Sequence, residues 1–401
     1  MTEEKVSELK RQFPEADEAS LLELLVVCDG SLSSAERLLM ETFPKGPTRK
    51  RSKVARQASI QSLMNRPVSK KLVSTNTSGS NKPVLLHTKE AIETTVPYST
   101  IHYNFLPNDL ADSLLQTIMD DTADFVASEF YLFGNRCVSK HDTKMYSSKP
   151  IDGIFYNGVE TKNKSEFTDF HGIAQVLIED QVNMEINERG RLPFQHQGQW
   201  VGDLALCNKF YTKSNNLDWH SDRLTYIGPH CTIASLSLGA TREFRVRKQY
   251  CSDDATSRFN TIYSIPLPHN TLLIMHAGFQ EEFKHCVSST TELIPHPVSG
   301  TLRVNLTYRH YLPRYKDHIP QCELCHSPME LRRMFKDPRT RGRYVWMCSR
   351  GYQGRDCAGK FYADFSADSL IAKDFNSASL WIAPDDHEAL QAFRESIGVV
   401  N

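Results

Sequence analysis

The chain has 401 residues, of which 40% are hydrophobic and 24% are charged, and its formal net charge is −1. This length allows two or more folded units. No uninterrupted apolar run reaches the length of a membrane-spanning helix, and residues 1–10 lack the apolar region of a signal peptide. The composition therefore argues against an integral membrane protein, and we expect a soluble intracellular protein.

The first 45 residues predict a small module of three helices, over residues 6–12, 17–28 and 33–41. The step Gln12-Phe13-Pro14 and the pair Leu38-Leu39 are similar to two motifs of the CUE domain, a ubiquitin-binding module. The resemblance implies that an exposed apolar patch binds ubiquitin or ubiquitinated proteins through Phe13, Pro14, Leu38 and Leu39. A helical module that binds another kind of partner is the alternative.

Residues 46–92 predict a flexible basic linker. Between Lys45 and Lys89 the chain has eleven Lys or Arg residues and no Asp or Glu. Such a segment buries too little apolar area to offset the entropy of ordering the chain. The cluster Arg49–Lys53 is compatible with a nuclear localisation signal or a phosphate-binding arm, and a plain solvated tether is the alternative. We therefore expect a nuclear protein, with the cytoplasm as a second location.

From residue 93 to 315 the pattern changes to short apolar or alternating runs separated by turn residues. Helices are predicted over residues 107–122 and 167–187. Strands are predicted over residues 235–238, 243–247, 261–267, 271–275 and 301–311. Helices that precede many strands indicate an α+β domain built on a double-sheet jelly roll. Two facing sheets can bring side chains from distant sequence positions to one interior site.

Two histidines and one aspartate in this region form a candidate metal site. His220 and Asp222 are separated by one residue, and His285 follows 63 residues after Asp222. On an extended strand, His220 and Asp222 point to the same side, because side chains alternate with period two. Two imidazoles and one carboxylate are the ligand set of non-haem Fe(II) oxygenases. Each residue alone fits an ordinary surface or core position, so the prediction depends on the ordered combination.

An arginine-bearing segment, residues 303–309, follows the second histidine. Alternate side chains share one face of a strand, which leaves the residues between them for an opposite, apolar face. The first set is Arg303, Asn305, Thr307 and Arg309, and the second is Val304, Leu306 and Tyr308. The arginines could hold an acidic co-substrate, because a guanidinium forms a bidentate pair with a carboxylate. An exposed edge strand guarded by charges is the alternative.

Residues 93–313 resemble the AlkB family of 2-oxoglutarate-dependent dioxygenases, which repair alkylated nucleic acid. The resemblance is carried by residues 206–211, 218–222, 235–247, 267–275 and 303–309. It implies that His220, Asp222 and His285 bind Fe(II), and that Arg303 pairs with the distal carboxylate of 2-oxoglutarate. It also implies that Asn208, Asn305 and Arg309 contact the other end of 2-oxoglutarate or the iron-ligand carboxylate. The expected reaction hydroxylates an N-methyl group on DNA or RNA.

The chain departs from the family pattern at Phe210, where the family has a tyrosine, and at Leu224, where many members have an acidic residue that reads the base. Losing the tyrosine hydroxyl should weaken co-substrate binding by about 1 kcal/mol. Tyr211 lies on the opposite face of the strand unless a bulge turns it inward. In the aromatic and basic stretch 130–159, the resemblance makes Tyr156 a candidate for stacking on an extruded base, and a core position is the alternative.

Residues 316–366 contain four cysteines, Cys322, Cys325, Cys348 and Cys357, spaced for a tetrahedral Zn²⁺ site. Together with the segments 341–344 and 357–361, they resemble a GRF zinc finger, a family that binds single-stranded nucleic acid. Phosphate contacts are expected from Arg339, Arg341 and Arg343, and base stacking from aromatics that include Tyr344 and Trp346. A purely structural zinc site is the alternative. Residues 367–401 are expected to be a tail with one helix over residues 385–396.

These patterns together predict a monomeric, Fe(II)- and 2-oxoglutarate-dependent oxygenase that demethylates alkylated single-stranded DNA or RNA, with a structural zinc ion and ubiquitin-linked recruitment. Two other classes stay open. The same iron chemistry could act on a protein or small molecule, in which case the zinc finger needs another explanation. The chain could also be a catalytically weak adaptor between ubiquitin and nucleic acid.

Overall fold

The computed structural model forms two units, residues 1–81 and 82–401. It describes residues 2–13, 21, 25, 32, 35–36, 83–132, 135–150, 155–156, 159–160, 163–249, 261–350 and 357–398. Within these ranges, no helix is both long enough and apolar enough to cross a membrane.

The first unit is described mainly at α1 (Thr2–Gln12), which includes the helix predicted over residues 6–12. Phe13 is only 3% exposed, so its expected place on an exposed patch is wrong. Phe13 directly follows the helix, and its ring packs in a small apolar core with Leu9, Leu21, Leu25 and Ala35. Pro14, Leu38 and Leu39 lie outside the described residues. Ubiquitin binding therefore stays a prediction from the sequence.

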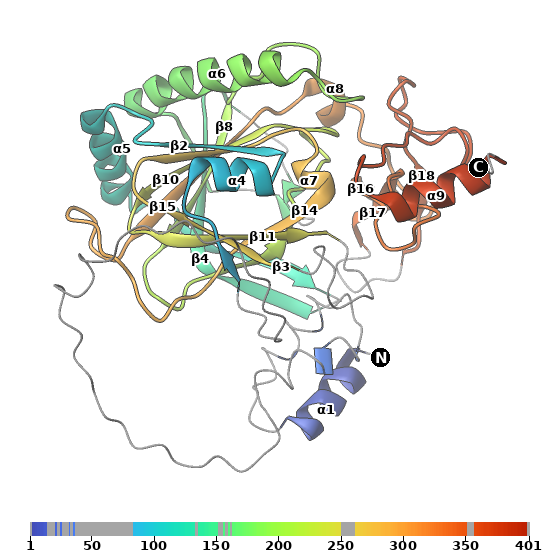
Figure 1. Cartoon of the computed structure of the whole chain (residues 1–401), viewed down its shortest axis with the longest axis horizontal. Helices are drawn as coiled ribbons and strands as arrows, with labels where there is room; N and C mark the ends of the chain where they lie inside the picture. The colour runs from blue at the N-terminus through green and yellow to red at the C-terminus, as the bar shows by residue number, and fades with distance from the viewer. Residues whose placement is uncertain are drawn as a thin grey trace, which may run out of the picture. The chain divides into compact units, whose positions relative to one another are not determined.

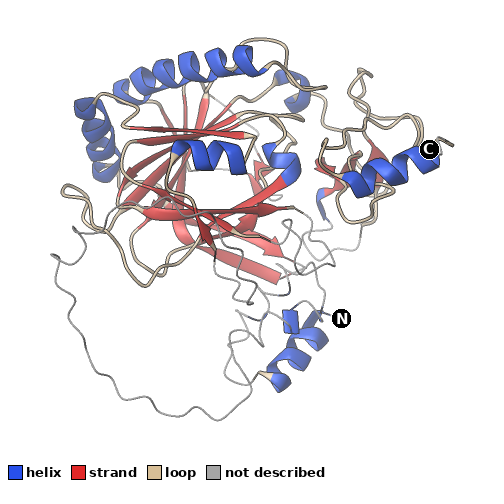
Figure 2. Ribbon diagram, viewed as in Figure 1, coloured by secondary structure: helices blue, strands red, loops and turns tan. Residues whose placement is uncertain are grey.

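Two sheets form the frame of the second unit (Figure 2). In order, the large sheet contains β2 (Ser99–Tyr103), β13 (Thr271–Met275), β10 (Ile233–Gly239), β15 (Arg303–Arg309), β8 (Leu204–Phe210), β4 (Asn135–Ser147) and β3 (Val126–Leu132), with β7 (Lys164–Glu166) beside β4. The small sheet contains β1 (Val84–Leu85), β12 (Tyr263–Leu267), β11 (Arg242–Lys248), β14 (Phe283–Val287) and β9 (Leu217–His220). A separate hairpin joins β5 (Phe155–Tyr156) to β6 (Val159–Glu160). The predicted α+β class is confirmed, and the two sheets are consistent with a jelly roll.

Two helices, α5 (Asn108–Asp120) and α6 (Asp169–Arg189), cover one face of the large sheet (Figure 1). They confirm the helices predicted over residues 107–122 and 167–187. Their apolar residues share a core with the apolar side chains of β15, which are Val304, Leu306 and Tyr308. The alternate side chains of β15, from Arg303 to Arg309, therefore face away from the helices. The predicted division of this strand into a polar and an apolar face is confirmed.

The folded unit begins earlier than the linker boundary expected at residue 92. Two residues of β1, Val84 and Leu85, pair in parallel with β12. The side chain of Thr88 accepts a hydrogen bond at the start of α4 (Lys89–Thr95), and Ile92 is fully buried. The ten described residues 83–92, which were assigned to the linker, therefore belong to the second unit. The sequence did not predict β1, because a strand of two residues is too short to give a periodic signal.

The C-terminal region, residues 316–398, is named the cysteine module here and follows the short helix α8 (Pro313–Lys316). It contains a sheet of β16 (Met329–Arg333), β17 (Tyr344–Cys348) and β18 (Lys360–Tyr362), followed by α9 (His387–Ser396). The helix predicted over residues 385–396 is confirmed. Residues 367–384 of the expected tail are also folded, because Leu370, Trp381 and Ala383 are buried.

The cysteine module is not a separately packed domain. One apolar core joins its Leu331, Tyr344 and Trp346 to Phe283 of β14 and to Phe279 of α7 (Phe279–Glu282). The module is drawn in red beside α7 and β14 in Figure 1. The expected boundary at residue 315 therefore divides a continuous core. Spacing of metal ligands predicts a local site, but it does not show which surface the surrounding residues pack against.

Deleting residues 316–401 should destabilise what remains of the second unit, because Leu224, Phe279 and Phe283 would lose their apolar neighbours. Complete exposure of such a side chain costs about 1.5–3 kcal/mol, and a domain is stable by only about 5–15 kcal/mol. Urea unfolding followed by far-UV circular dichroism should show a much lower midpoint or no cooperative transition. A truncated chain that unfolds at the midpoint of the full chain would contradict the shared core.

Candidate active site

Three side chains with metal-ligating atoms meet between the two sheets. His220 ends β9 and lies opposite His285 of β14 in the strand register, and Asp222 follows two residues after β9. The Nε2 atoms of both histidines lie 3.6 Å from Oδ1 of Asp222. The three ligand atoms lie within 4.8 Å of one another. Ligand atoms on one ion with bonds of about 2.0–2.2 Å lie some 3–4 Å apart, so this donor set fits a single metal ion.

The two carboxylate oxygens of Asp222 face different partners. Oδ1 faces the imidazoles, whereas Oδ2 accepts hydrogen bonds from Nε of Arg309 at 2.7 Å and from its Nη2. Burial opposes ionisation of Asp222, but the charges of Arg309 and the two histidines outweigh it and lower the pKa to about 2. Burial and the neighbouring His220 lower the pKa of His285 to about 3. At neutral pH the site thus presents one carboxylate and a neutral His285, the forms that bind metal.

The orientation of His220 is set by its own strand. Its Nδ1 lies 2.7 Å from the carbonyl oxygen of Asp218. Since a carbonyl only accepts, Nδ1 carries the proton and the lone pair of Nε2 is left for a metal. The ring of His285 stacks on Phe244 of β11 at a centroid distance of 5.2 Å. Both imidazoles are therefore held in place without the metal.

Arg303, at the start of β15, is a buried guanidinium that lacks an acidic partner among the described residues. It is 1% exposed, and its Nη2 donates to Oγ of Ser237 at 2.9 Å. Its Nε and Nη1 have no hydrogen-bond partner in the described part of the chain. Burial and the nearby charge of Arg242 lower the pKa of Arg303 to about 9. A buried charge without a counter-ion costs several kcal/mol, so this position is suited to an anionic ligand.

Phe210, which replaces the tyrosine of the family pattern, lies beneath both arginines. Its ring centroid is 5.2 Å from the guanidinium of Arg303 and 5.7 Å from that of Arg242. His141 also stacks on the ring at 5.0 Å. Phe210 therefore supplies a cation–π contact in place of a hydroxyl. Tyr211 is 41% exposed, so it does not take over the role of the missing tyrosine.

The two asparagines predicted to contact the co-substrate lie opposite each other on β8 and β15. Nδ2 of Asn305 donates to Oγ of Ser235 at 2.8 Å and to the carbonyl of Leu236 at 3.1 Å. Asn208 is buried and hydrogen-bonds His141. Asn305 shares the polar face of β15 with Arg303 and Arg309, so the polar positions predicted for this strand lie along one side of the interior.

The cysteine module differs from its predicted role in nucleic-acid contact. Arg341 is 4% exposed and pairs with Asp386 at 3.0 Å, and the buried Arg343 donates to the carbonyl of Ala378. Tyr344 and Trp346 are fully buried and cannot stack on bases. The two arginines are covered by residues 375–388, whereas Tyr344 and Trp346 belong to the core that the module shares with the two sheets.

Two other predicted nucleic-acid contacts differ from these buried groups. Arg339 is 81% exposed and pairs with Asp337 at 2.8 Å. Tyr156 belongs to β5, but its side chain lies outside the described residues. Arg339 is therefore the predicted phosphate contact that the structure leaves accessible.

The four cysteines of the module are brought together. Their Sγ atoms lie within 4.8 Å of one another, at 3.5 Å between Cys322 and Cys357 and 3.4 Å between Cys325 and Cys348. A Cβ atom at Gly359 would collide with Sγ of Cys322, so the backbone approaches the sulfur cluster closely. Four converging thiols with this packing fit a tetrahedral Zn²⁺ site.

A third cluster, which the sequence analysis missed, contains Asp112, His269 and His296. The backbone N–H of Gly239 donates to Nδ1 of His269 at 3.0 Å, which places the ring proton on Nε2. That Nε2 lies 3.5 Å from Asp112, and the ring stacks on His296 at 4.4 Å. A protonated Nε2 and parallel rings do not suit metal coordination, so this cluster connects α5 to the segments that carry His269 and His296.

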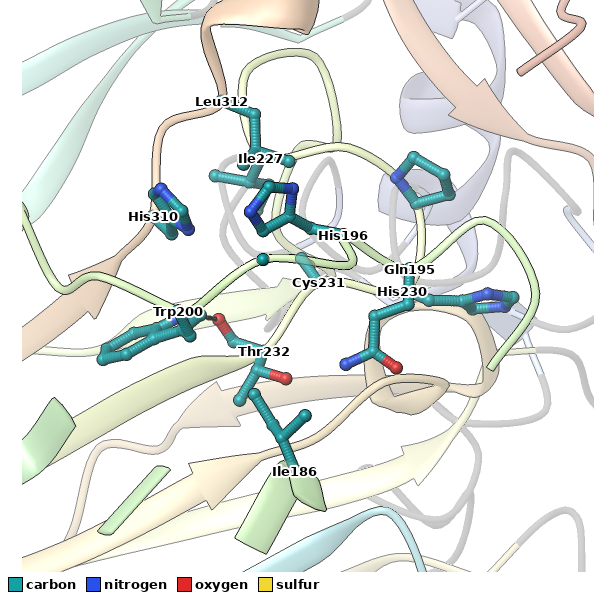
Figure 3. Close-up of a pocket in the computed structure, with 12 residues that line it drawn as sticks. Ile186, Gln195, His196, Trp200, Ile227, His230, Cys231, Thr232, His310 and Leu312 are labelled. Atoms are coloured by element: carbon teal, nitrogen blue, oxygen red, sulfur yellow. Dashed lines mark hydrogen bonds between the residues drawn. The ribbon is translucent and has the colours of Figure 1, made fainter. Parts of the chain in front are cut away.

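Figure 3 shows a pocket near the end of α6 that is separate from the triad. It is lined in part by Ile186 of α6, Trp200 and His310, with His196 in edge-to-face contact with His310 at 5.1 Å. Burial and the neighbouring His196 lower the pKa of His310 to about 4, so this histidine is neutral at pH 7. The lining includes neither the triad nor Arg303.

Comparison with known families identifies the class. Residues 99–309 match the 2OG-Fe(II) oxygenase superfamily, and the chain belongs to this superfamily. This range contains the triad, Arg303 and the polar face of β15.

Several known proteins are similar over shorter stretches. A human protein, "Alpha-ketoglutarate-dependent dioxygenase alkB homolog 3", is 38% identical over 109 residues, which are 27% of this chain and 36% of that protein. "DNA oxidative demethylase ALKBH2" of Arabidopsis thaliana is 26% identical over 195 residues, 44% of this chain and 55% of that protein. A solved structure, "The structure of OsALKBH1", covers 53% of this chain and 98% of that chain at 16% identity and a TM-score of 0.36.

Replacing Arg303 with Met should remove the uncompensated charge while keeping a similar side-chain volume. The variant should be more stable than the parent without co-substrate, by about 1 kcal/mol or more. In addition, 2-oxoglutarate should no longer raise the thermal unfolding temperature of the Mn(II)-loaded protein. Arg242→Met is the matched control and should lose stability, because Arg242 donates to three backbone carbonyls. Retained stabilisation of Arg303→Met by 2-oxoglutarate would assign the anion to another residue.

Proposed function

We propose that this protein oxidatively demethylates alkylated bases in DNA or RNA. The main support for the proposal is that a candidate metal site and a candidate anion site lie between the same two sheets. Two imidazoles and one carboxylate oxygen converge at His220, Asp222 and His285, and the buried guanidinium of Arg303 lacks an anion among the described residues. These features match the two components that define the superfamily, a metal ion and a dicarboxylic co-substrate.

The residues have separate roles in this proposal. The triad would hold Fe(II), and Arg303 would pair with the distal carboxylate of 2-oxoglutarate. Arg309 keeps Asp222 ionised and turns its Oδ1 toward the imidazoles. When bound, the metal and co-substrate supply dioxygen-dependent hydroxylation of an N-methyl carbon, after which formaldehyde leaves the base. The two sheets shield this chemistry from side reactions.

Nucleic acid is the substrate class that the relatives support. The Arabidopsis relative is named as a DNA demethylase. The base preference of members with an acidic residue at the position of Leu224 does not carry over to this chain, because Leu224 is 5% exposed and packs in the shared core. It therefore cannot read an exocyclic amino group.

The central test uses Fe(II), ascorbate and 2-oxoglutarate with a panel of methylated single-stranded DNA and RNA oligonucleotides. Loss of a methyl group, measured by mass, should match succinate formation one to one. Asp222→Ala should abolish both, since it removes a metal ligand. Glu243→Ala deletes a half-exposed carboxylate of β11 that pairs with Arg245, and it should leave turnover unchanged. Succinate formed without any change in the oligonucleotides would favour a protein or small molecule as the substrate.

We also propose that the cysteine module holds one Zn²⁺. Support comes from the four converging thiols and from the close approach of Gly359 to Cys322. Metal analysis of the purified chain should give one zinc per molecule, and Cys325→Ser should lose it. Cys207→Ser, at a buried cysteine outside the module, should retain the zinc. Equal zinc content in the two variants would remove the assignment. Single-strand capture by Arg339, ubiquitin binding and nuclear location stay predictions from the sequence.

A further inference from the structure

The loop that carries Asp222 continues directly onto the cysteine module. Arg223 forms an ion pair with Glu330 of β16. Oγ1 of Thr225 accepts a hydrogen bond from the backbone N–H of Leu331 at 3.1 Å. Between them, Leu224 is buried in the core that the module shares with the catalytic sheets. Two of the three residues after a metal ligand, Arg223 and Thr225, are thus held by β16 of the module.

The same loop is held on its other side by α7. The backbone N–H of Asp222 donates to Oε1 of Gln280 at 2.7 Å. Oγ of Ser221 donates to the carbonyl of Phe283 at 2.8 Å. Since β14 starts at Phe283 and carries His285, α7 sets the spacing between two of the three metal ligands. The position of α7 therefore affects the geometry of the triad.

The cysteine module also fixes α7, through Arg333. Both Glu281 and Glu282 of α7 are fully buried. The Nη2 of Arg333 lies 3.0 Å from Oε1 of Glu282, and its Nη1 donates to the backbone carbonyl of Glu281 at 2.7 Å. Lys248 provides the second contact to Glu282, at 3.1 Å. Removing Arg333 would leave a buried carboxylate with half of its charge compensation, three residues before His285.

The sulfur cluster lies beside the first residue of β16, in the three-stranded sheet of the cysteine module, whereas Arg333 is the last residue of that strand. Met329 of β16 pairs with Cys348 of β17, and the N–H of Met329 donates to the carbonyl of Pro320 at 2.9 Å. Glu330 and Leu331, which contact the loop after Asp222, follow Met329 directly. A metal bound by the thiols would therefore fix the strand that supports the iron ligands.

We propose that the cysteine module positions the iron ligands, with Arg333 and Glu330 as its positioning residues. The proposal rests on the assignment of Fe(II) to the triad. It gives the module a role in metal affinity that is independent of nucleic-acid capture. Loss of zinc should consequently weaken iron binding 37 or more residues away in the sequence, through β16 and α7.

The test measures Mn(II) binding to the full chain by the EPR signal of free Mn(II), at a temperature where every variant is folded. Arg333→Met should bind Mn(II) at least about tenfold more weakly than the parent. Arg333→Lys, which keeps the charge, should recover part of the affinity. Glu330→Gln should weaken binding in the same direction, and it carries the test if Arg333→Met does not fold.

Arg341→Met is the matched control for loss of module stability. Arg341 is also a buried arginine, but its carboxylate partners, Asp386 and Glu388, belong to the module. This variant should unfold at a lower temperature and keep the Mn(II) affinity of the parent. Parent-like affinity in both Arg333→Met and Glu330→Gln would overturn the proposal. Failure of the parent to bind Mn(II) would instead overturn the assignment of the triad.

Discussion

The site depends on Asp222, whose two carboxylate oxygens contact different partners. One oxygen pairs with Arg309 and the other faces the imidazoles of His220 and His285. Arg309 keeps the carboxylate charged although it is buried, and it prevents rotation that would exchange the two oxygens. Because Arg309 ends β15 and Arg303 begins it, one strand connects the metal ligands to the anion position. The separation between metal and co-substrate is thus fixed by a regular element.

The cysteine module, which lies outside the two sheets, also contacts the loop that carries Asp222. The loop after Asp222 lies between β16 of the module and α7, so the module contacts the protein close to the metal ligands. The buried arginines of the module contribute to its own structure and to this junction, with Arg341 bound to Asp386 and Arg333 bound to Glu282. Their burial explains why Arg333, Arg341 and Arg343 are not accessible for phosphate contacts.

The sequence predicted those parts of the site that depend on local alternation. The polar face of β15 follows from period two, and the pairing of His220 with Asp222 follows from one intervening residue at the end of a strand. Apart from the approach of His285 to His220 and Asp222, which the family resemblance implied, it did not predict contacts between distant segments. The pattern of residues 331–360 indicates a basic surface, yet Arg341 and Arg343 are buried against residues 375–388. The helix predicted over residues 385–396 does not by itself show which surface it covers. Phe13 was misplaced for a similar reason, because a helix-end aromatic suits both a surface and a small core.

The central claim is that the triad and Arg303 bind Fe(II) and 2-oxoglutarate together in one site. Anaerobic addition of 2-oxoglutarate to the Fe(II)-loaded protein tests it most directly, by the visible charge-transfer absorption of a chelated complex. The account predicts a band that saturates at one equivalent of each component. A band that is absent at saturating 2-oxoglutarate, with Fe(II) still bound, would contradict it.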